Sequence, residues 1–465
     1  MQYLSTRGRA PRLGFSEALL AGLARDGGLY LPEAWPQFGA DEIRSMRGLP
    51  YPDVAMRVLT PFLGGEIDTA TFSRIVGEAY ATFKHDAVCP LVQTGPNEFL
   101  LELFHGPTLA FKDVAMQLLA RLMDHVLAAL GARATIVGAT SGDTGGAAIE
   151  AFAGRERTDV FILFPHGRVS PVQQRQMTTS GAANVHALAI EGNFDDCQGL
   201  VKEMFNHHSF RDRLQLSGVN SINWARVMAQ IVYYFTSALS LGAPDRAISF
   251  VVPTGNFGDI FAGFAAKRMG LPVERLVIAT NDNDILARTL AAGRYETRAV
   301  VPTTSPSMDI QVSSNFERLL FEASGRNADE VGRYMANLKQ SGSFAVEAAT
   351  LAAIRDEFDA DRAGVGETAE TIRSVLASDG YLLDPHTATA VRVARKGAPG
   401  AVPQVVLATA HPAKFPAAVE AACGTVPQLP AALADLMDRE ERFTVLPSQL
   451  KMVEEYIEQR ARLRS

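Results

Sequence analysis

Lys112 has the residue type and the surroundings that covalent chemistry requires. An apolar run over 99–104 stops at the loop HGPT (105–108), and a helical pattern begins near Lys112, between Phe111 and Val114. The partial positive charge of a helix N-terminus and the apolar neighbours both disfavour the ammonium form of a lysine. A free amine can attack a carbonyl and form a Schiff base. A lone lysine at a helix start more often extends to solvent, so this interpretation depends on the rest of the chain.

A glycine-rich loop follows the apolar run ATIVGA (134–139) and precedes the helical pattern AAIEAFA. Its glycines let backbone N–H groups approach a ligand, and the helix that follows adds positive potential. We expect a carboxylate there, because the glycine spacing differs from the G-x-G-x-x-G of dinucleotide sites. Taken alone, the loop is equally consistent with a plain tight turn. The residues predicted to bind substrate are Thr140, Ser141, Gly142, Asp143 and Thr144.

A second glycine-bounded loop, TGNFGD (254–259), lies between the strand pattern SFVVP and the helical pattern DIFAGFAAKRMG. Backbone N–H groups at such a helix start form a nest that holds a phosphate. No Gly-Lys-Ser/Thr follows, so a phosphate monoester suits this loop better than a nucleoside triphosphate. The residues predicted to hold this phosphate are Gly255, Asn256, Phe257, Gly258 and Asp259.

Two further positions could direct polar groups at a ligand. Thr409 ends the run QVVLA with a hydroxyl at the carboxyl edge of the expected sheet, and His411 and Lys414 follow it. Asn223 and Arg226 lie three residues apart, on one face of the first turn of a long apolar helical pattern. The bland alternatives are that Asn223 caps that helix and that His411 and Lys414 are ordinary loop residues.

Together these features match the requirements of pyridoxal 5′-phosphate (PLP). The lysine would bind the aldehyde, the nest would hold the cofactor phosphate, and the anion loop would hold an amino-acid carboxylate. The strand-end hydroxyl would meet the pyridine nitrogen. An uncharged partner there leaves the ring less electron-withdrawing than an aspartate would, which favours elimination over transamination.

The elements that position these residues alternate between strand and helix patterns from about residue 88 onward. Continuous apolar or β-branched runs are typical of strands buried on both faces, and the helical spacers predict βαβ units with a parallel sheet. The predicted strands are 98–104, 134–139, 159–164, 184–190, 247–252, 275–280 and 404–409. The predicted helices are 112–130, 144–153, 170–180, 195–206, 223–240, 258–268, 284–292 and 313–323.

The remaining stretches predict mainly helices. Residues 1–90 predict a small helical unit without a catalytic cluster, and 327–380 predict helices interrupted by a loop at 359–366. The tail 447–462 predicts a terminal helix that Ser448 caps. Its apolar residues at helical spacing are Leu450, Val453 and Ile457.

Composition excludes several classes of protein. With 47% hydrophobic and 20% charged residues over 465 positions, the chain can bury a large core. A net charge of −7 argues against a nucleic-acid or anionic-membrane partner, and we expect neither. There is no apolar run of membrane-spanning length and no metal-ligand spacing. Because the N-terminus has no signal-peptide pattern and the three cysteines are far apart, we expect a cytoplasmic protein with reduced thiols.

The chain resembles the threonine synthase family of PLP enzymes, which share the tryptophan-synthase-β-like fold. The matching segments, spread over most of the chain, are GGLYLP (27–32), HGPTLAFKD (105–113), ATSGDTGGAA (139–148), NSINWARV (220–227), PTGNFGDIFAG (253–263), SPSMDIQVSSNFERLLFE (305–322), DPHTA (384–388) and ATAHPAKF (408–415).

The resemblance implies PLP-dependent fold type II, with two open, mostly parallel α/β sheets, the active site between them and a small N-terminal mainly helical unit. It further implies conversion of O-phospho-L-homoserine and water to L-threonine and phosphate. Lys112 would bind PLP and act as catalyst, residues 255–258 would hold its phosphate, and Thr409 would face the pyridine nitrogen. Arg226 and Lys414 would receive the leaving phosphate.

Some assignments stay open from the sequence. His411 and Asn223 would assist the two cations. Asp143 is awkward beside a substrate carboxylate, and it would either cap its helix or meet a cofactor oxygen. We expect an N-terminal unit over 1–90, a large domain over 91–130 and 241–465, and a small domain over 131–240, in a monomer or homodimer.

The alternatives are a related PLP phospholyase, a serine/threonine dehydratase, or a PLP-binding regulatory protein without turnover. A dinucleotide-dependent enzyme is disfavoured because the glycine fingerprint and the ribose-binding acid are missing.

Overall fold

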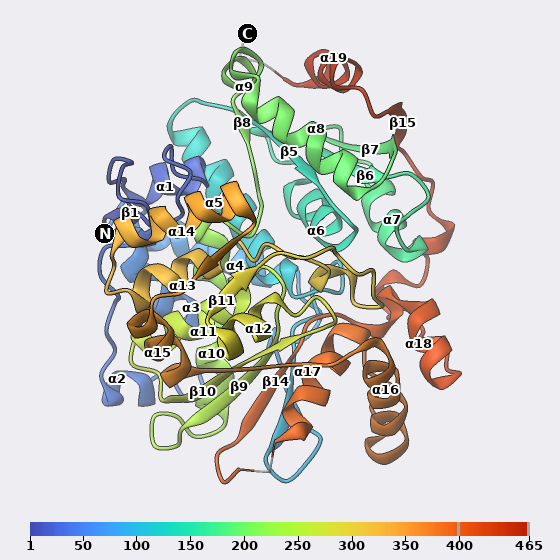
Figure 1. The fold of residues 1–465 in the computed structure, drawn as a ribbon. Coiled ribbons are helices and arrows are strands. Elements are labelled where there is room, and N and C mark those ends of the chain that lie inside the picture. Colours follow the sequence, from blue (N-terminus) through green and yellow to red (C-terminus); the bar gives the residue numbers. More distant parts are fainter. Residues whose placement is uncertain (398–399, 463–465) are drawn as a thin grey trace.

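Two open β-sheets form the framework of the computed structural model, which describes residues 1–397 and 400–462 (Figure 1). The larger sheet has the strand order β13-β10-β9-β14-β4-β3, and the smaller has the order β15-β7-β6-β5-β8. Within these two sheets only β3 and β4 pair antiparallel. The larger sheet contains β3 (Leu91–Gln93), β4 (Glu98–Glu102), β9 (Ile248–Pro253), β10 (Val273–Thr280), β13 (Phe358–Arg362) and β14 (Gln404–Ala408). The smaller contains β5 (Ala134–Ala139), β6 (Thr158–Pro165), β7 (Val185–Glu191), β8 (Leu216–Ser217) and β15 (Thr444–Pro447).

All seven predicted strands are present, with ends within two residues of the prediction. The reason is burial on both faces. All eight residues of β6 are buried. On β14, Val405 and Leu407 pack in the main core, whereas Val406 and Ala408 pack in a second apolar cluster on the opposite face. The predicted α/β fold class, with mostly parallel sheets, is therefore confirmed.

The eight predicted helices are also present, and α13 begins three residues later than predicted. They are α5 (Lys112–Ala129), α6 (Asp143–Phe152), α7 (Pro171–Thr178), α8 (Phe194–Asn206), α10 (Trp224–Ser240), α11 (Gly258–Arg268), α12 (Ile285–Ala292) and α13 (Phe316–Ala323). The further elements of this part of the chain are α9 (His208–Leu214), β11 (Arg294–Glu296), η2 (Pro306–Met308), α14 (Ala328–Ser341), β12 (Ser343–Ala345), α15 (Ala348–Glu357), α16 (Val365–Asp379), α17 (Pro385–Lys396), η3 (Pro412–Lys414), α18 (Pro416–Cys423), η4 (Ala431–Leu433) and η5 (Leu436–Asp438).

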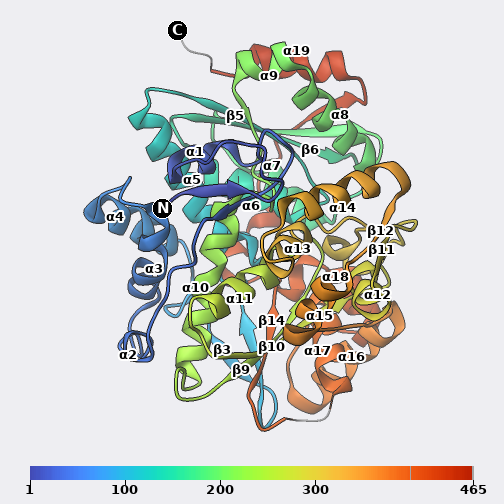
Figure 2. The ribbon, with the colours of Figure 1, turned by 60° about the vertical axis from the view of Figure 1, so that its left-hand side comes forward.

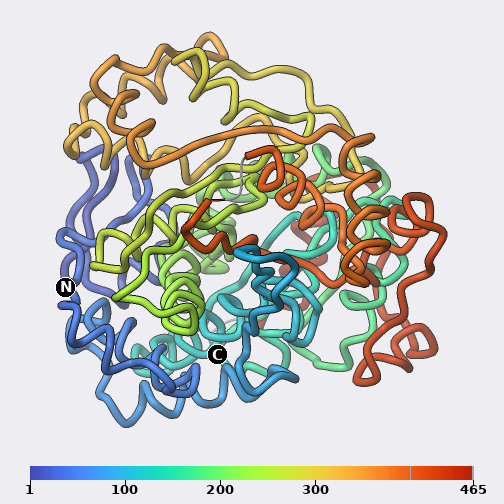
Figure 3. Tube along the Cα trace, turned by 90° about the horizontal axis from the view of Figure 1, so that it is seen from below, coloured from blue at the N-terminus to red at the C-terminus, as the bar shows by residue number. Residues whose placement is uncertain are grey.

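The N-terminal unit is mainly helical, as predicted, and it packs beside α5 and α10 (Figure 2). Its elements are β1 (Tyr3–Ser5), α1 (Phe15–Ala21), β2 (Tyr30–Pro32), α2 (Ala40–Arg44), α3 (Tyr51–Leu59), η1 (Thr60–Leu63) and α4 (Thr69–Tyr80). The rings of Tyr3 and Phe62 lie against Trp224, with centroids 6.3 and 5.7 Å away. Seen from below, this blue unit and the red C-terminal part of the chain lie at opposite edges (Figure 3).

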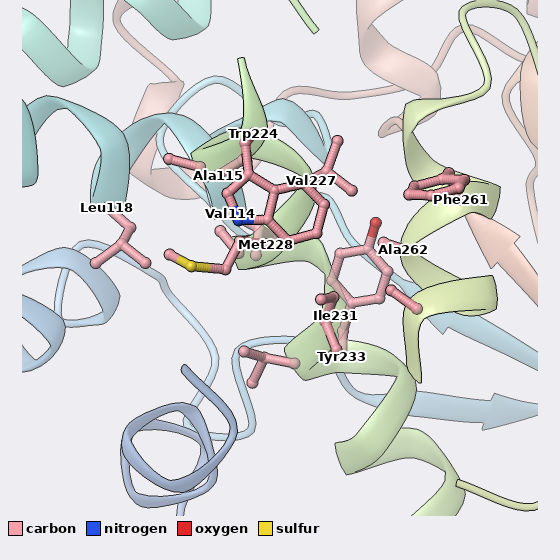
Figure 4. Close-up of a cluster of buried hydrophobic side chains, with 14 of the residues drawn as sticks. Val114, Ala115, Leu118, Trp224, Val227, Met228, Ile231, Tyr233, Phe261 and Ala262 are labelled. Atoms are coloured by element: carbon pink, nitrogen blue, oxygen red, sulfur yellow. The ribbon is translucent and has the colours of Figure 1, made fainter. Parts of the chain in front are cut away.

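A cluster of buried side chains joins α5, α10 and α11 (Figure 4). Val114 and Leu118 of α5 and Trp224 and Val227 of α10 are at most 1% exposed. Complete burial of one such side chain is worth roughly 1.5–3 kcal/mol. The cluster therefore fixes the first turns of α5 and α10, which are the turns with Lys112 and Arg226.

The predicted loop at 359–366 is wrong over its first half. Residues 358–362 form β13, an edge strand that pairs parallel with β10. The sequence FDADR has a single large apolar residue, so its pattern lacks the continuous apolar run of the other strands. Backbone pairing with β10, between Phe358 and Leu276 at one end and Arg362 and Thr280 at the other, is what makes it a strand.

The C-terminal tail also differs from the prediction. Pro447 ends β15, and α19 (Leu450–Arg460) begins after Gln449, so Ser448 is not its cap. Val453 and Ile457 are buried as expected. Because β15 pairs with β7, this tail adds to the smaller sheet and not to the large domain. We propose that the small domain comprises 131–240 together with 444–460.

Candidate active site

Lys112 is the first residue of α5, and the loop before it is fixed to the end of β14. The backbone N–H of Phe111 donates to the carbonyl of Thr409 at 2.8 Å, and the N–H of Leu103 donates to the carbonyl of Ala408 at 2.9 Å. Lys112 is only 8% exposed. A strand end of the larger sheet thus presents this lysine at the start of a buried helix, as the sequence predicts.

The charges around Lys112 balance two opposing effects. Burial lowers its pKa, while the nearby charge of Asp143 raises it. The charges of Arg226 and Lys414 lower it further, and the net shift is downward. The amine of Lys112 is therefore closer to its nucleophilic form than the amine of an exposed lysine.

Asp143 joins the two sheets, because it follows β5 of the smaller sheet and contacts Lys112 of the larger. Its Oδ2 lies 3.3 Å from Lys112 Nζ and accepts from the Ser307 hydroxyl at 3.1 Å. Its Oδ1 lies 3.2 Å from Lys414 Nζ and accepts from Gln173 Nε2 at 2.8 Å. The carboxylate neither caps α6 nor remains free; it sits between two ammonium groups.

The pKa of Asp143 reflects these neighbours. Burial acts to raise it, but the charges of Lys112 and Lys414 outweigh burial and hold the pKa well below its usual range. Asp143 is therefore ionised at neutral pH. Two lysines contact this one carboxylate and the charge of Arg226 acts on Lys112, so the site has an excess of positive charge that suits an anionic ligand.

Lys414 is completely buried and its amine is fully bonded. Nζ donates to the Thr108 carbonyl and to Gln176 Oε1, both at 2.6 Å, in addition to its contact with Asp143. It is placed in the site by η3, directly after β14. The structure thus brings Lys414 to Lys112 through Asp143, as the sequence hypothesis requires.

Three polar residues of this cluster were missed in the sequence analysis. Ser307 donates to Asp143, and Gln173 and Gln176 contact Asp143 and Lys414. Ser307 lies in the segment 305–322, which resembles the family but for which no residue role is predicted. The two glutamines lie on α7, where only their spacing of three on one helix face hinted at a shared direction.

The loop 254–259 has the geometry of a phosphate nest. Throughout 1–397 and 400–462, we find no protein acceptor for the backbone N–H groups of residues 255–259. The Gly255 carbonyl accepts from the Ser313 hydroxyl at 2.6 Å, and the Asn256 carbonyl accepts from Asn315 Nδ2 at 2.9 Å. Phe257 has a φ of 65°, the left-handed conformation found in such nests. These bonds hold the Gly255 and Asn256 carbonyls away from the nest, so the N–H groups of 255–259 can bind an anion.

The side chain of Asp259 does not contribute to this nest. Its Oδ1 accepts from the hydroxyls of Tyr233 at 2.5 Å and Tyr234 at 3.0 Å, both on α10. Burial raises the pKa of Asp259 to about 7, against the lowering effect of the two tyrosine bonds. The prediction that Asp259 holds a phosphate can therefore apply only to its backbone N–H group and not to its side chain.

The loop 140–144 is organised by one hydroxyl. Thr140 Oγ1 accepts from the N–H groups of Gly142 and Gly145, each at 2.9 Å. Gly142 has a φ of 143°, and a Cβ there would lie 2.4 Å from Gln173. Thr140 and Gly142 therefore shape the turn. The assignment of Ser141, Thr144 and the rest of the loop to the substrate stays a prediction.

Asn223 is used by the protein itself. Its side chain is the N-cap of α10, accepting from the Ala225 N–H at 3.0 Å, and Nδ2 donates to the Leu19 carbonyl at 2.9 Å. The expectation that its amide assists a ligand is not supported, because capping a buried helix start requires these bonds.

Arg226 keeps unused hydrogen-bonding capacity. It is 4% exposed, Nη1 donates to the Val219 carbonyl at 3.1 Å, and its buried Nε has no partner among the described residues. Burial lowers the pKa of Arg226 to about 10, so it stays charged at neutral pH. A buried guanidinium with a free donor is a candidate anion ligand.

The predicted contact of His411 with the substrate stays a prediction. His411 lines a separate cavity of about 1020 Å³ with His105, Tyr381 and Glu102, and this cavity does not include Lys112. Its Nδ1 accepts from the Ala413 N–H at 3.1 Å and caps η3. Burial lowers the pKa of His411 to about 4, so the imidazole is neutral and cannot balance phosphate charge.

The residues present fit PLP as a cofactor. A buried lysine with lowered pKa, a set of free backbone N–H groups and a strand-end hydroxyl converge here. At Gly255 a Cβ would lie 2.7 Å from the Ser307 carbonyl, so only glycine allows the nest to approach this loop. Thr409, which is 6% exposed, directly follows β14 and lies beside the Lys112 loop. Its contact with the pyridine nitrogen stays a prediction.

This fold and site define a PLP-dependent enzyme, and comparison with known proteins gives the same class. The family model described as pyridoxal-phosphate dependent enzyme matches residues 92–362. The models described as threonine synthase N terminus and threonine synthase, C-terminal match residues 2–80 and 387–457. The chain belongs to the threonine synthase family.

Individual relatives cover nearly the whole chain. Threonine synthase of Pseudomonas aeruginosa is 56% identical over 461 residues, which are 99% of this chain and 98% of that protein. A crystal structure of PLP-bound threonine synthase from Brucella melitensis is 72% identical, with a TM-score of 0.98 over 99% of this chain and 100% of that one. The threonine synthase structure from yeast is 39% identical, with a TM-score of 0.94 over 99% and 98%.

No group of three or more His, Cys, Asp or Glu side chains in 1–397 and 400–462 is arranged to hold a metal ion. Among the helices in that same part of the chain, none combines the length and apolarity needed to cross a membrane.

Proposed function

We propose that this protein converts O-phospho-L-homoserine and water to L-threonine and phosphate, by γ-elimination followed by β-hydration, as the last step of threonine biosynthesis. The observation that supports it best is the buried contact of Lys112 and Lys414 with the single carboxylate of Asp143, with the further positive charge of Arg226 acting on Lys112. A substrate with a phosphate and a carboxylate needs such an excess of positive charge in a dry site.

When bound, PLP supplies an electron sink that acidifies the substrate's Cα–H bond. Lys112 would bind its aldehyde through Nζ, the N–H groups of 255–259 would hold its phosphate, and the Thr409 hydroxyl would meet its ring nitrogen. The side chains of Asn256, Phe257 and Asp259 are not required for this binding, since the nest uses the backbone.

Lys112 is the group that moves protons at the substrate. Its lowered pKa leaves a larger share of free amine at neutral pH, which lets it remove a proton from Cα. The same amine can take a proton from Cβ as phosphate leaves Cγ, and it can then return protons at Cγ and Cα while water adds at Cβ, because its position at the start of α5 is fixed by the loop on β14. Burial of the site keeps out bulk water.

The substrate's own anionic groups have separate candidate partners. The N–H groups at the start of α6 and the Ser141 and Thr144 hydroxyls would hold the carboxylate. Lys414 and Arg226 would stabilise the phosphate that leaves from Cγ. Because Lys414 Nζ is bonded to Thr108, Gln176 and Asp143, it would exchange one partner to reach this phosphate.

The purified enzyme tests this function by its products. We expect a visible chromophore that borohydride bleaches, and equal amounts of threonine and phosphate from O-phosphohomoserine. Phosphate with 2-oxobutyrate and ammonia, but without threonine, would identify a phospholyase or dehydratase instead. A colourless protein that forms no threonine would overturn the proposal.

The two phosphate ligands are tested by matched substitutions. Arg226→Met and Lys414→Met should raise KM for O-phosphohomoserine about tenfold or more, since each loses one charge-assisted contact. Arg226→Lys keeps the positive charge but loses the two-pronged guanidinium geometry, so its KM should lie between those of wild type and Arg226→Met. Unchanged KM in Arg226→Met would remove this residue from the site.

A further inference from the structure

Ser307 occupies the space between the nest and the Lys112–Asp143 pair. Its hydroxyl accepts from Lys112 Nζ at 3.3 Å and donates to Asp143 Oδ2 at 3.1 Å. On its other side, its carbonyl lies against Gly255 of the nest. No role follows for it from the sequence or from the proposed cofactor contacts.

The loop that contains Ser307 is firmly held to the end of β10. Asn281, just beyond that strand, donates through Nδ2 to the hydroxyls of Thr303 and Ser305 and to Asp309 Oδ1, at 2.8, 2.9 and 2.7 Å. Asp309 Oδ2 accepts from the Thr303 N–H at 2.8 Å. These buried and partly buried bonds specify one position for the loop.

A buried histidine fixes the backbone of Ser307 through a hydrogen bond. The Ser307 N–H donates to His386 Nε2 at 3.2 Å, so Nε2 must be unprotonated. The proton is therefore on Nδ1, which donates to Asp384 Oδ2 at 2.8 Å. His386 and Asp384 are 3% and 1% exposed, and both lie at the start of α17, in the segment DPHTA. Asp384 thus selects the tautomer that can hold Ser307.

Asp143 Oδ2 has two donors, and they compete for it. An ammonium and a carboxylate in direct contact normally approach to about 2.7–2.9 Å. The Lys112–Asp143 distance is 3.3 Å, while the Ser307 hydroxyl takes the same oxygen at 3.1 Å. The other oxygen is occupied by Lys414 and Gln173. Sharing Oδ2 weakens the hold of Asp143 on the lysine nitrogen.

We propose that Ser307 is a catalytic residue that keeps the Lys112 nitrogen from closing into a tight ion pair with Asp143, and that His386, oriented by Asp384, is its positioning residue. By sharing the carboxylate oxygen, Ser307 leaves the lysine nitrogen able to lose its proton at neutral pH. The assignment concerns the PLP-binding lysine and does not depend on which substrate the enzyme uses.

The holoenzyme allows a direct test, since the visible absorbance of bound PLP changes when the linked Lys112 nitrogen gains or loses its proton. In Ser307→Ala, Asp143 Oδ2 is left to this nitrogen alone, so the proton is held more strongly. We expect the absorbance midpoint to rise by about half to one pH unit, and kcat at neutral pH to fall roughly three- to tenfold. KM should change less than about twofold, since Ser307 does not bind the leaving phosphate.

Ser305→Ala is the matched control, because it removes a buried hydroxyl from the same loop without a contact to Lys112. It should lower the thermal midpoint and leave the absorbance midpoint unchanged. An unchanged absorbance midpoint in Ser307→Ala, or an equal shift in Ser305→Ala, would overturn the proposal.

Asp384→Asn tests the positioning role without removing the helix cap, since asparagine caps helices as well as aspartate. Its amide would donate to His386 Nδ1 and force the proton onto Nε2, where it opposes the Ser307 N–H. We expect the absorbance midpoint to shift in the same direction as in Ser307→Ala, but less. A folded Asp384→Asn holoenzyme with the wild-type midpoint would exclude His386 and Asp384 from this role.

Discussion

The loops 254–259 and 140–146 both lie between a parallel strand and a helix, yet they offer a ligand different groups. The first offers backbone N–H groups, and the side chain of Asp259 turns away to two tyrosines. In the second, Thr140 takes two of the N–H groups for the turn, and Asp143 adds a negative charge. The nest is therefore positive by itself, whereas the other loop depends on Lys112 and Lys414 for its charge.

The two loops should therefore respond to different kinds of substitution. A backbone nest is sensitive to any added Cβ that blocks its approach and insensitive to side-chain identity. A site whose charge balance depends on side chains is sensitive to a single charge change and to pH. Substitutions in and beside the two loops test this contrast.

Lys112→Ala removes the amine that is proposed to bind PLP and to transfer protons at the substrate. We expect threonine formation to fall by roughly a thousandfold or more and the borohydride-sensitive absorbance to disappear, because no other amine takes this position. Activity assays and absorbance spectra measure both. Lys451→Ala, an exposed lysine on α19, is the control and should match wild type. Retained borohydride-sensitive absorbance in Lys112→Ala would assign the cofactor to another lysine.

Gly255→Ala and Gly142→Ala test the roles of the two loops separately. In the nest, the new Cβ would meet the Ser307 carbonyl at 2.7 Å, so PLP affinity should fall about a hundredfold. At Gly142, with a φ of 143° and Gln173 at 2.4 Å, the strain should raise the substrate KM while PLP stays bound. Equilibrium dialysis of PLP and steady-state kinetics distinguish them. Equal loss of PLP in both variants would contradict the contrast.

Asp143→Asn removes the charge that raises the pKa of Lys112. The lysine nitrogen should then lose its proton more readily, so the absorbance midpoint of the holoenzyme should move to lower pH, opposite to Ser307→Ala. We expect kcat to fall roughly tenfold, since Lys414 also loses its partner. The exposed Asp212→Asn is the control. A midpoint that rises would show that Asp143 does not act on Lys112 through its charge.

Asp259→Asn should leave PLP affinity within about threefold, because only the backbone of this residue faces the nest. Its effect is on stability. The folded state holds the Asp259 proton up to a pKa of about 7, whereas the unfolded chain releases it near its ordinary value. The folded state thus binds more protons across this window, so wild-type stability falls as pH rises through it.

The variant lacks this titration, so its free energy of unfolding should exceed that of wild type by roughly 1–3 kcal/mol more at about pH 8 than at about pH 5. Denaturant unfolding at the two pH values measures the difference. The same difference at both values would show that Asp259 does not titrate in this range.

Much of the framework could be predicted because its signals are local. The seven strands are continuous apolar runs, and burial on both faces lets such runs form only one kind of element. The glycine loops follow these strands directly, so their place at the sheet edge is fixed by connectivity. β13 was missed because its sequence FDADR has no apolar run and depends on pairing with β10.

Side-chain directions could not be predicted in the same way. Asn223, Asp259 and His411 lie in the predicted loops. However, the Asn223 amide donates to the Leu19 carbonyl, the Asp259 carboxyl accepts from the tyrosines of α10, and His411 lines a separate cavity. A residue's type and position in a loop do not determine which neighbour satisfies its hydrogen bonds.

Local sequence patterns specify the α/β framework, the lysine at the start of α5 and the two anion loops, because hydrophobic periodicity and glycine placement act over a few residues. The placement of Asp143 between Lys112 and Lys414, with Ser307 on its carboxylate and His386 behind Ser307, arises from tertiary contacts. These residues are separated by tens to hundreds of positions in the chain. They meet because the two sheets place their loops against each other. A pattern of a few neighbouring residues does not encode which distant loops come into contact.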